Sequence, residues 1–155
     1  MLAEAESNIK KFGINNIELI HSNSLADVKN VQFDIVHTYI VLQHIPVKAG
    51  YQIIQSLVAA IKPGGVGMLQ FPYRNDKGLF QNMGRHIKSK YKFAKMLSNL
   101  LRNRPISQPY MQMNNYDLKR VLHIFEDGKI GSYYAEFTNH GGFYGICMYV
   151  KKQDS

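Results

Sequence analysis

The hydrophobic pattern changes its period twice within residues 33–73. Residues 33–42 (FDIVHTYIVL) form an apolar, largely β-branched run, which is typical of a strand buried on both faces. Over residues 49–61 the apolar positions recur at helical spacing, and KPGG at 62–65 ends this helix, because proline cannot continue it and glycine tolerates a positive φ. Residues 65–73 (GVGMLQFPY) then predict a second strand. Such a β-α-β unit is right-handed with parallel strands, and ligands bind beyond the carboxyl ends of the strands.

The remainder of the chain predicts further elements of ordinary length. They are an amphipathic helix at 2–12, a strand at 16–21 (NIELIH), a helix at 116–125, and strands at 129–138 and 142–151. Asn114 or Asn115 is expected to cap the third of these, and Asn139-His140-Gly141 to join the last two as a hairpin.

Three features of the central unit carry a family resemblance. They are Asp34 after an aromatic residue, the run Leu42-Gln43-His44-Ile45, and the KPGG turn, in that order. Together they resemble the fourth-strand to fifth-strand half of class I S-adenosylmethionine-dependent methyltransferases. The resemblance implies an α/β, Rossmann-like three-layer sandwich with a mostly parallel sheet and a C-terminal antiparallel hairpin.

The resemblance covers only the last two-thirds of that family's domain. The family's first two strands and its glycine-rich cofactor loop have no counterpart here, so residues 1–155 are interpreted as one partial domain. In the family those strands lie between the counterparts of 16–21 and 33–42, and without them an apolar strand edge is bare. Three remedies are open: the flanking strands pair directly, a second copy docks as a homodimer, or the missing piece belongs to a longer protein. We favour a closed-up sheet with an associated second copy.

The resemblance also implies a cofactor site for S-adenosylmethionine. By position, Asn23 and Ser24 would meet the adenine, although a plain Asn/Ser turn explains them equally well. Thr38, Tyr39 and Gln43 would face the methionine part of the cofactor.

His44 is the candidate catalytic residue. It follows the first strand of the unit, and histidine is suited to act as a general base near neutral pH, although it could also cap or pack at the helix start. Candidate acceptor-binding residues are Tyr73, Arg74, Asn75 and Arg85. His37 is expected to be a core histidine and His140 a surface one. No spacing of Cys, His or acidic residues indicates a metal site.

The positive charge of the chain is local. Residues 74–104 contain nine Lys or Arg and one acid, which accounts for the whole net charge of +8. We interpret residues 74–110 as a basic helical insertion. It could be a lid that holds an anionic acceptor, a helix on an anionic membrane surface, a nucleic-acid patch, or the solvated face of a packed helix. Nucleic acid ranks last, because no RNA-binding motif accompanies it.

The single cysteine, Cys147, and the lack of an apolar leader or membrane-length run favour a cytoplasmic protein. The sequence therefore predicts an S-adenosylmethionine-dependent methyltransferase, or its C-terminal part, acting on an oxygen of a small molecule, sugar or lipid. The alternative is a non-enzymatic remnant that binds a partner or an anionic surface through the basic segment.

Overall fold

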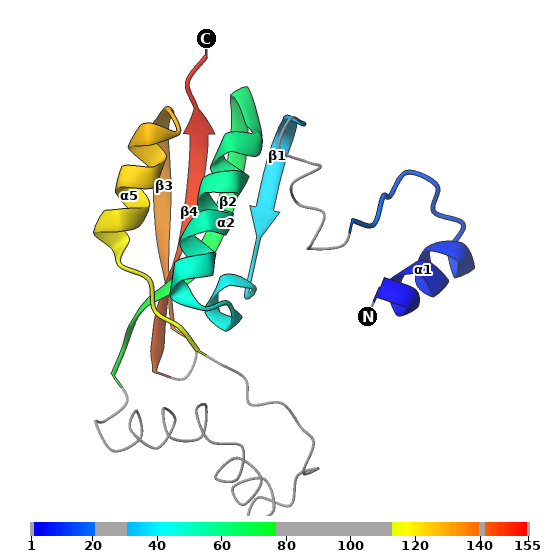
Figure 1. Ribbon diagram of the computed structural model, residues 1–155, viewed down its shortest axis with the longest axis horizontal. Helices are drawn as coiled ribbons and strands as arrows, with labels where there is room; N and C mark the ends of the chain where they lie inside the picture. The colour runs from blue at the N-terminus through cyan, green and yellow to red at the C-terminus, as the bar shows by residue number, and fades with distance from the viewer. Residues whose placement is uncertain (1, 21–30, 77–112, 140–141, 155) are drawn as a thin grey trace, which may run out of the picture.

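The computed structural model describes residues 2–20, 31–76, 113–139 and 142–154 (Figure 1). Its elements in chain order are α1 (Leu2–Lys11), β1 (Phe33–Thr38), the short 3-10 helix η2 (Leu42–His44), α2 (Val47–Ala60), β2 (Ile61–Asn75), α5 (Leu118–Asp127), β3 (Ile130–Asn139) and β4 (Phe143–Lys152). The two predicted helices of the main body and the C-terminal strand pair are confirmed to within two residues at each end. The first predicted strand is shorter than expected, because the chain leaves it after Thr38.

The four strands form one sheet in the order β1-β2-β4-β3. β1 and β2 are parallel, with Ile35 opposite Val66 and Thr38 opposite Leu69, so the predicted β-α-β unit is confirmed. β4 is antiparallel to both β2 and β3. The expectation of a mostly parallel sheet is therefore wrong, because two of the three strand pairings are antiparallel.

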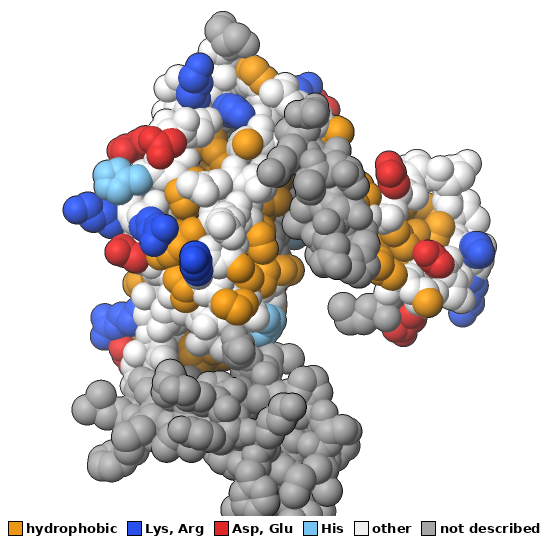
Figure 2. Space-filling view, viewed as in Figure 1, with side chains coloured by type: hydrophobic (Ala, Val, Ile, Leu, Met, Phe, Trp, Pro, Cys, Tyr) orange, Lys and Arg blue, Asp and Glu red, His pale blue; other side chains and the backbone are white. Residues whose placement is uncertain are grey.

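Helices α2 and α5 lie side by side on one face of the sheet and build the core with it (Figure 1). The core side chains are Ile54 and Val58 of α2, Val121 and Phe125 of α5, and Leu69, Phe71, Ile146 and Met148 of the sheet. Each fully buried side chain of this kind contributes about 1.5–3 kcal/mol. On the outer surface of this layer, charged side chains gather over α5 (Figure 2).

No described helix packs on the opposite face of the sheet, so the three-layer arrangement is not seen among the described residues, although Gln70 and Cys147 are buried on that face. Ile35 is 70% exposed, and Val66, Tyr134 and Tyr149 are also exposed on this face. His37 lies there too and is exposed, so its interpretation as a core histidine is wrong. The apolar run in β1 is thus buried on one face only.

The N-terminal part corrects a second expectation. Helix α1 forms as predicted but buries no side chain. Residues 16–20, expected to be a strand, are not one, and β1 pairs only with β2 within the part of the chain that the structure describes. The apolar alternation at 16–20 has no strand there to pair with, and alternation by itself does not hold a strand together. The closed-up sheet is therefore wrong.

Local signals explain the remaining boundaries. Asp117, and not Asn114 or Asn115, caps α5, and its carboxylate accepts a hydrogen bond from the Lys119 N–H at 2.9 Å.

Cys147 is buried in β4, where burial raises the pKa of its thiol. Across the described ranges, no helix has the length and apolar character needed to span a membrane.

Candidate functional site

The chain makes a strained turn where it leaves the carboxyl end of β1. Ile40 has a φ of 59°. This left-handed conformation costs roughly 1–2 kcal/mol for a residue with a Cβ, and a β-branched residue tolerates it least. The Ile40 N–H donates a hydrogen bond to the side-chain oxygen of Gln70 on β2 at 3.0 Å, and Gln70 is fully buried. A contact from the neighbouring strand therefore supports the turn.

The turn leads directly into η2, which presents Gln43 and His44. Gln43 is only 8% exposed, whereas His44 is half-buried. The Gln43 Nε2 lies 3.1 Å from the His44 Nε2. An amide nitrogen can only donate, so this contact is a hydrogen bond when the His44 Nε2 carries no proton. The amide thus orients the imidazole.

The segment before α5 ties η2 to β2 through Tyr116. Its hydroxyl lies 2.8 Å from the Leu42 carbonyl oxygen and 3.0 Å from that of Ile45, and its own N–H donates to the Pro72 carbonyl at 2.8 Å. Burial raises the pKa of Tyr116 to about 12, and Tyr51 adds to this rise. Tyr116 therefore fixes η2 relative to β2, with its hydroxyl on η2 and its backbone N–H on β2.

Two neighbours complete this arrangement. Asn114 donates to the Gln43 carbonyl both from its backbone N–H at 2.8 Å and from its Nδ2 at 3.3 Å. Gly50 of α2 lies so close to Tyr116 that a Cβ on it would come within 2.0 Å of the Tyr116 hydroxyl oxygen. A glycine at position 50 is thus what lets the tyrosine ring pass under α2.

The predicted acceptor-binding residues lie further along β2. Thr38 is opposite Leu69, so Tyr73 is roughly 13 Å beyond the end of β1, taking about 3.3 Å per residue. Tyr73 packs partly into the core, with its ring centroid 6.0 Å from that of Phe137. The Arg74 Nε lies 2.7 Å from the Asp76 carboxylate, and its guanidinium lies over the Tyr144 ring at 5.6 Å. Arg74 would have to exchange these contacts to hold an anionic acceptor.

The predicted cofactor residues divide into two groups. Asn23 and Ser24, together with Arg85 and most of the basic segment, lie outside the described residues. Thr38 is buried at the end of β1 and Tyr39 is exposed just after it, so both lie next to the turn that leads to Gln43. The structure thus places Thr38, Tyr39, Gln43 and His44 along one short stretch at the end of β1. Tyr116 links this stretch to β2, the strand that carries Tyr73, Arg74 and Asn75.

Three residues of this region were not predicted from the sequence: Ile40, Gln70 and Tyr116. For Gln70 a signal was present, because it is a polar residue inside an apolar strand run. The left-handed turn at Ile40 gave no signal, since isoleucine is a poor residue for that conformation. No group of three or more His, Cys, Asp or Glu is placed to hold a metal ion among the residues that the structure describes.

The turn presents both apolar and polar groups at the strand end. Tyr39, Ile40 and Val41 are all exposed and supply the apolar surface. Polar contacts are available from Gln43 and His44.

Comparison with known proteins places the fold. No model of a protein family matches the chain, and no curated protein matches it. Among solved structures, an O-methyltransferase family protein from Burkholderia thailandensis matches 97% of this chain and 40% of its own, at 12% identity and a TM-score of 0.57. Magnesium protoporphyrin IX methyltransferase from Synechocystis PCC 6803, solved with bound SAH, matches 99% of this chain and 60% of its own, at 16% identity and a TM-score of 0.59.

Another match is the YcgJ protein from Bacillus subtilis, with 97% of this chain and 77% of its own covered, 10% identity and a TM-score of 0.58. The chain has the α/β fold of the two methyltransferase structures named first. It spans 40–60% of the length of the first two.

Proposed function

We propose that this chain carries the acceptor-side part of an S-adenosylmethionine-dependent methyltransferase site, and that the methyl acceptor is an oxygen of a small molecule, sugar or lipid. The observation that supports this most is the parallel β1-α2-β2 unit, which places η2 with Gln43 and His44 just beyond the end of β1. The similarity of fold to solved methyltransferases supports the same class.

The residues of the β1 exit have separate roles in this proposal. S-adenosylmethionine, when bound, supplies an activated methyl group on a positively charged sulfur. Tyr39 and the turn that follows it offer apolar contact, and Gln43 offers an amide. His44 takes the proton from the acceptor hydroxyl as the oxygen attacks. For this step the acceptor hydroxyl replaces the Gln43 amide at His44 Nε2, the nitrogen that the amide contacts in the structure.

The acceptor is expected to approach from the end of β2. Tyr73, Asn75 and Arg74 are the residues of the described chain that we assign to it, with Arg85 of the basic segment as a further contact. If the acceptor is anionic, Arg74 must leave Asp76 to reach it. Substitution of Asp76 by Asn would then free Arg74 and lower the KM for an anionic acceptor, while leaving the KM of a neutral one unchanged.

Isothermal titration calorimetry with S-adenosylmethionine and S-adenosylhomocysteine tests the proposal directly. We expect measurable binding by the unmodified protein, weakened by Gln43→Ala. His44→Ala should keep cofactor binding but lose methyl transfer to an oxygen acceptor by about 100-fold or more. The matched control is His123→Ala, because His123 lies exposed on α5, where it contacts Glu126. Absence of heat at about millimolar ligand would favour the non-enzymatic alternative, since binding that weak is only about 4 kcal/mol.

A further inference from the structure

The buried polar side chains of the described residues are concentrated at one place. They are Thr38, Gln43 and Gln70, and all three lie at or beside the exit of β1. Gln70 differs from the other two because it belongs to the neighbouring strand and has no exposed surface. A buried amide costs free energy unless both its oxygen and its nitrogen make hydrogen bonds. A glutamine in the middle of an apolar strand therefore needs an explanation.

One end of the Gln70 amide is used by the turn. Its Oε1 accepts the hydrogen bond from the Ile40 N–H, the residue with the left-handed φ of 59°. Isoleucine is β-branched and strongly disfavours this conformation, so the surrounding structure must hold it there. The bond to Gln70 does this from outside the turn.

The other end of the Gln70 amide, Nε2, lies against Gly145. Gln70 Nε2 has no hydrogen-bond partner among the described residues, and a Cβ added to Gly145 of β4 would lie 2.9 Å from it. The same Cβ would lie 2.6 Å from Thr138 Oγ1, which also lacks a partner there. Glycine at 145 therefore leaves the room in which the Gln70 side chain sits.

We propose that Gln70 is a positioning residue for the methyl-transfer site. Seated against Gly145, it holds Ile40 in the left-handed conformation and so fixes the turn that presents Tyr39, Gln43 and His44. This inference rests on the proposed function for its effect on cofactor binding, but not for its effect on the turn.

The effect on the turn is measured by hydrogen exchange of the Ile40 amide, read by NMR without any ligand. Gln70→Met has nearly the same volume but cannot accept the bond, so we expect Ile40 exchange to rise by about 10-fold or more while Tm is unchanged or higher. Gln70→Glu keeps an acceptor oxygen and should retain the protection. Unchanged exchange in Gln70→Met would overturn the inference, whether or not the protein binds the cofactor.

The effect on binding is measured by calorimetry with S-adenosylmethionine. Gln70→Met should weaken binding by about 10-fold. A loss of this size is expected when the strained backbone conformation at Ile40 is no longer held by a hydrogen bond. Adding Ile40→Asn should restore most of this affinity, because asparagine tolerates the left-handed region, whereas adding Ile40→Val should not.

The outcomes separate the two ideas. A fall in Tm parallel to the fall in affinity, or equal behaviour of the Asn and Val double variants, would make Gln70 a merely structural residue and overturn the inference. No binding by the unmodified protein would instead count against the proposed function, and the exchange measurement would still decide the role of Gln70.

Discussion

The hydroxyl group of Tyr116 stands between two carbonyl oxygens, those of Leu42 and Ile45, with only 1% of the residue exposed. Its ring meets Tyr51 and Phe71 edge to face, at centroid distances of 5.4 and 6.1 Å. Burial of the phenol disfavours its charged form, and this is the main reason that the pKa of Tyr116 rises to about 12. The neighbouring Tyr51 adds to the rise.

Tyr116→Phe should lower the free energy of unfolding by about 1–2 kcal/mol at neutral pH, because the carbonyls of Leu42 and Ile45 lose the donor that they share. The pH dependence is a sharper test. The folded-state pKa of about 12 lies above the ordinary value of 10.0, so the stabilisation is complete below pH 10 and is lost as the pH rises towards 12. Urea titrations from pH 8 to about pH 11.5 should show this loss in the unmodified protein. If the difference in unfolding free energy between the unmodified protein and Tyr116→Phe stays constant with pH, this prediction is wrong.

Gly50 offers a second test at the same place. In an unhindered helix Gly→Ala stabilises by about 1 kcal/mol, but here the new Cβ meets the Tyr116 ring and hydroxyl. We expect Gly50→Ala to destabilise by about 1–3 kcal/mol. The control is Ser56→Ala on the exposed side of the same helix, because the Ser56 hydroxyl donates to the Gln52 carbonyl within α2. Thermal unfolding of the two variants compares them, and a stabilised Gly50→Ala would show that Tyr116 is not seated under α2.

At the scale of elements, the carboxyl end of α2 depends on a side chain from β4. The Lys152 ammonium donates to the carbonyls of Val58 and Ala59 at 3.3 Å each and of Ile61 at 2.8 Å. A cation is favourable at this end of a helix. Burial, with a smaller contribution from Lys129, lowers the pKa of Lys152, so part of that gain is offset by desolvation.

Lys152→Met should therefore cost about 1–2 kcal/mol of unfolding free energy, measured by urea denaturation. The preceding residue of β4 gives the control. Lys151 is exposed, and its ammonium is 3.8 Å from the Asp154 carboxylate, so Lys151→Met should change stability by less than about 0.5 kcal/mol. Equal effects of the two substitutions would show that the α2 end does not rely on Lys152.

The elements that the sequence predicted well are those whose pattern is satisfied by close neighbours. Helix α2 and strands β2 and β4 pack against one another, so period and burial agree. The predicted KPGG turn at 62–65 is wrong, because β2 begins at Ile61 and contains these residues. The strand expected at 16–21 failed because an alternating pattern needs a partner strand, and the pattern does not say which one. In the site, Gln43 and His44 were predicted from position in the chain, whereas Gln70 and Tyr116 act across about 30 and 70 residues, a pairing that no local pattern records.

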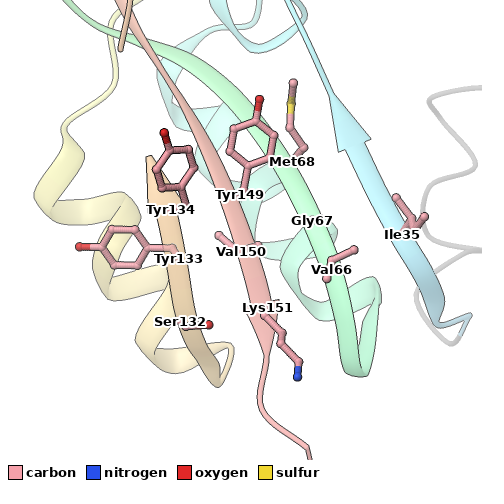
Figure 3. A pocket seen from close by; sticks show the side chains of 10 residues that line it. All are labelled: Ile35, Val66, Gly67, Met68, Ser132, Tyr133, Tyr134, Tyr149, Val150 and Lys151. Carbon is pink, nitrogen blue, oxygen red and sulfur yellow. The ribbon is translucent and has the colours of Figure 1, made fainter. Parts of the chain in front are cut away.

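At the scale of the whole molecule, one face of the sheet exposes a group of large apolar side chains. Ile35, Val66, Met68, Tyr134 and Tyr149 line a hollow of about 490 Å³ on this face (Figure 3). The Tyr149 hydroxyl donates a hydrogen bond to the Glu136 carboxylate at 3.2 Å. This contact is the main cause that raises the pKa of Tyr149. Within the described chain the outer edge of β1 also has no strand beside it.

A bare parallel edge next to an apolar face is a surface that proteins normally cover, and we predict that two copies of this chain associate through it. Ile35 lies at that edge with its side chain on the open face, so Ile35→Lys should disfavour association by placing a charge in the interface. Gln55→Lys adds the same charge on the exposed outer side of α2 and should leave association unchanged. Light scattering on a size-exclusion column at several concentrations distinguishes the cases. A monomer at every concentration, or a dimer that both substitutions dissociate equally, would mean that the β1 edge is not the contact.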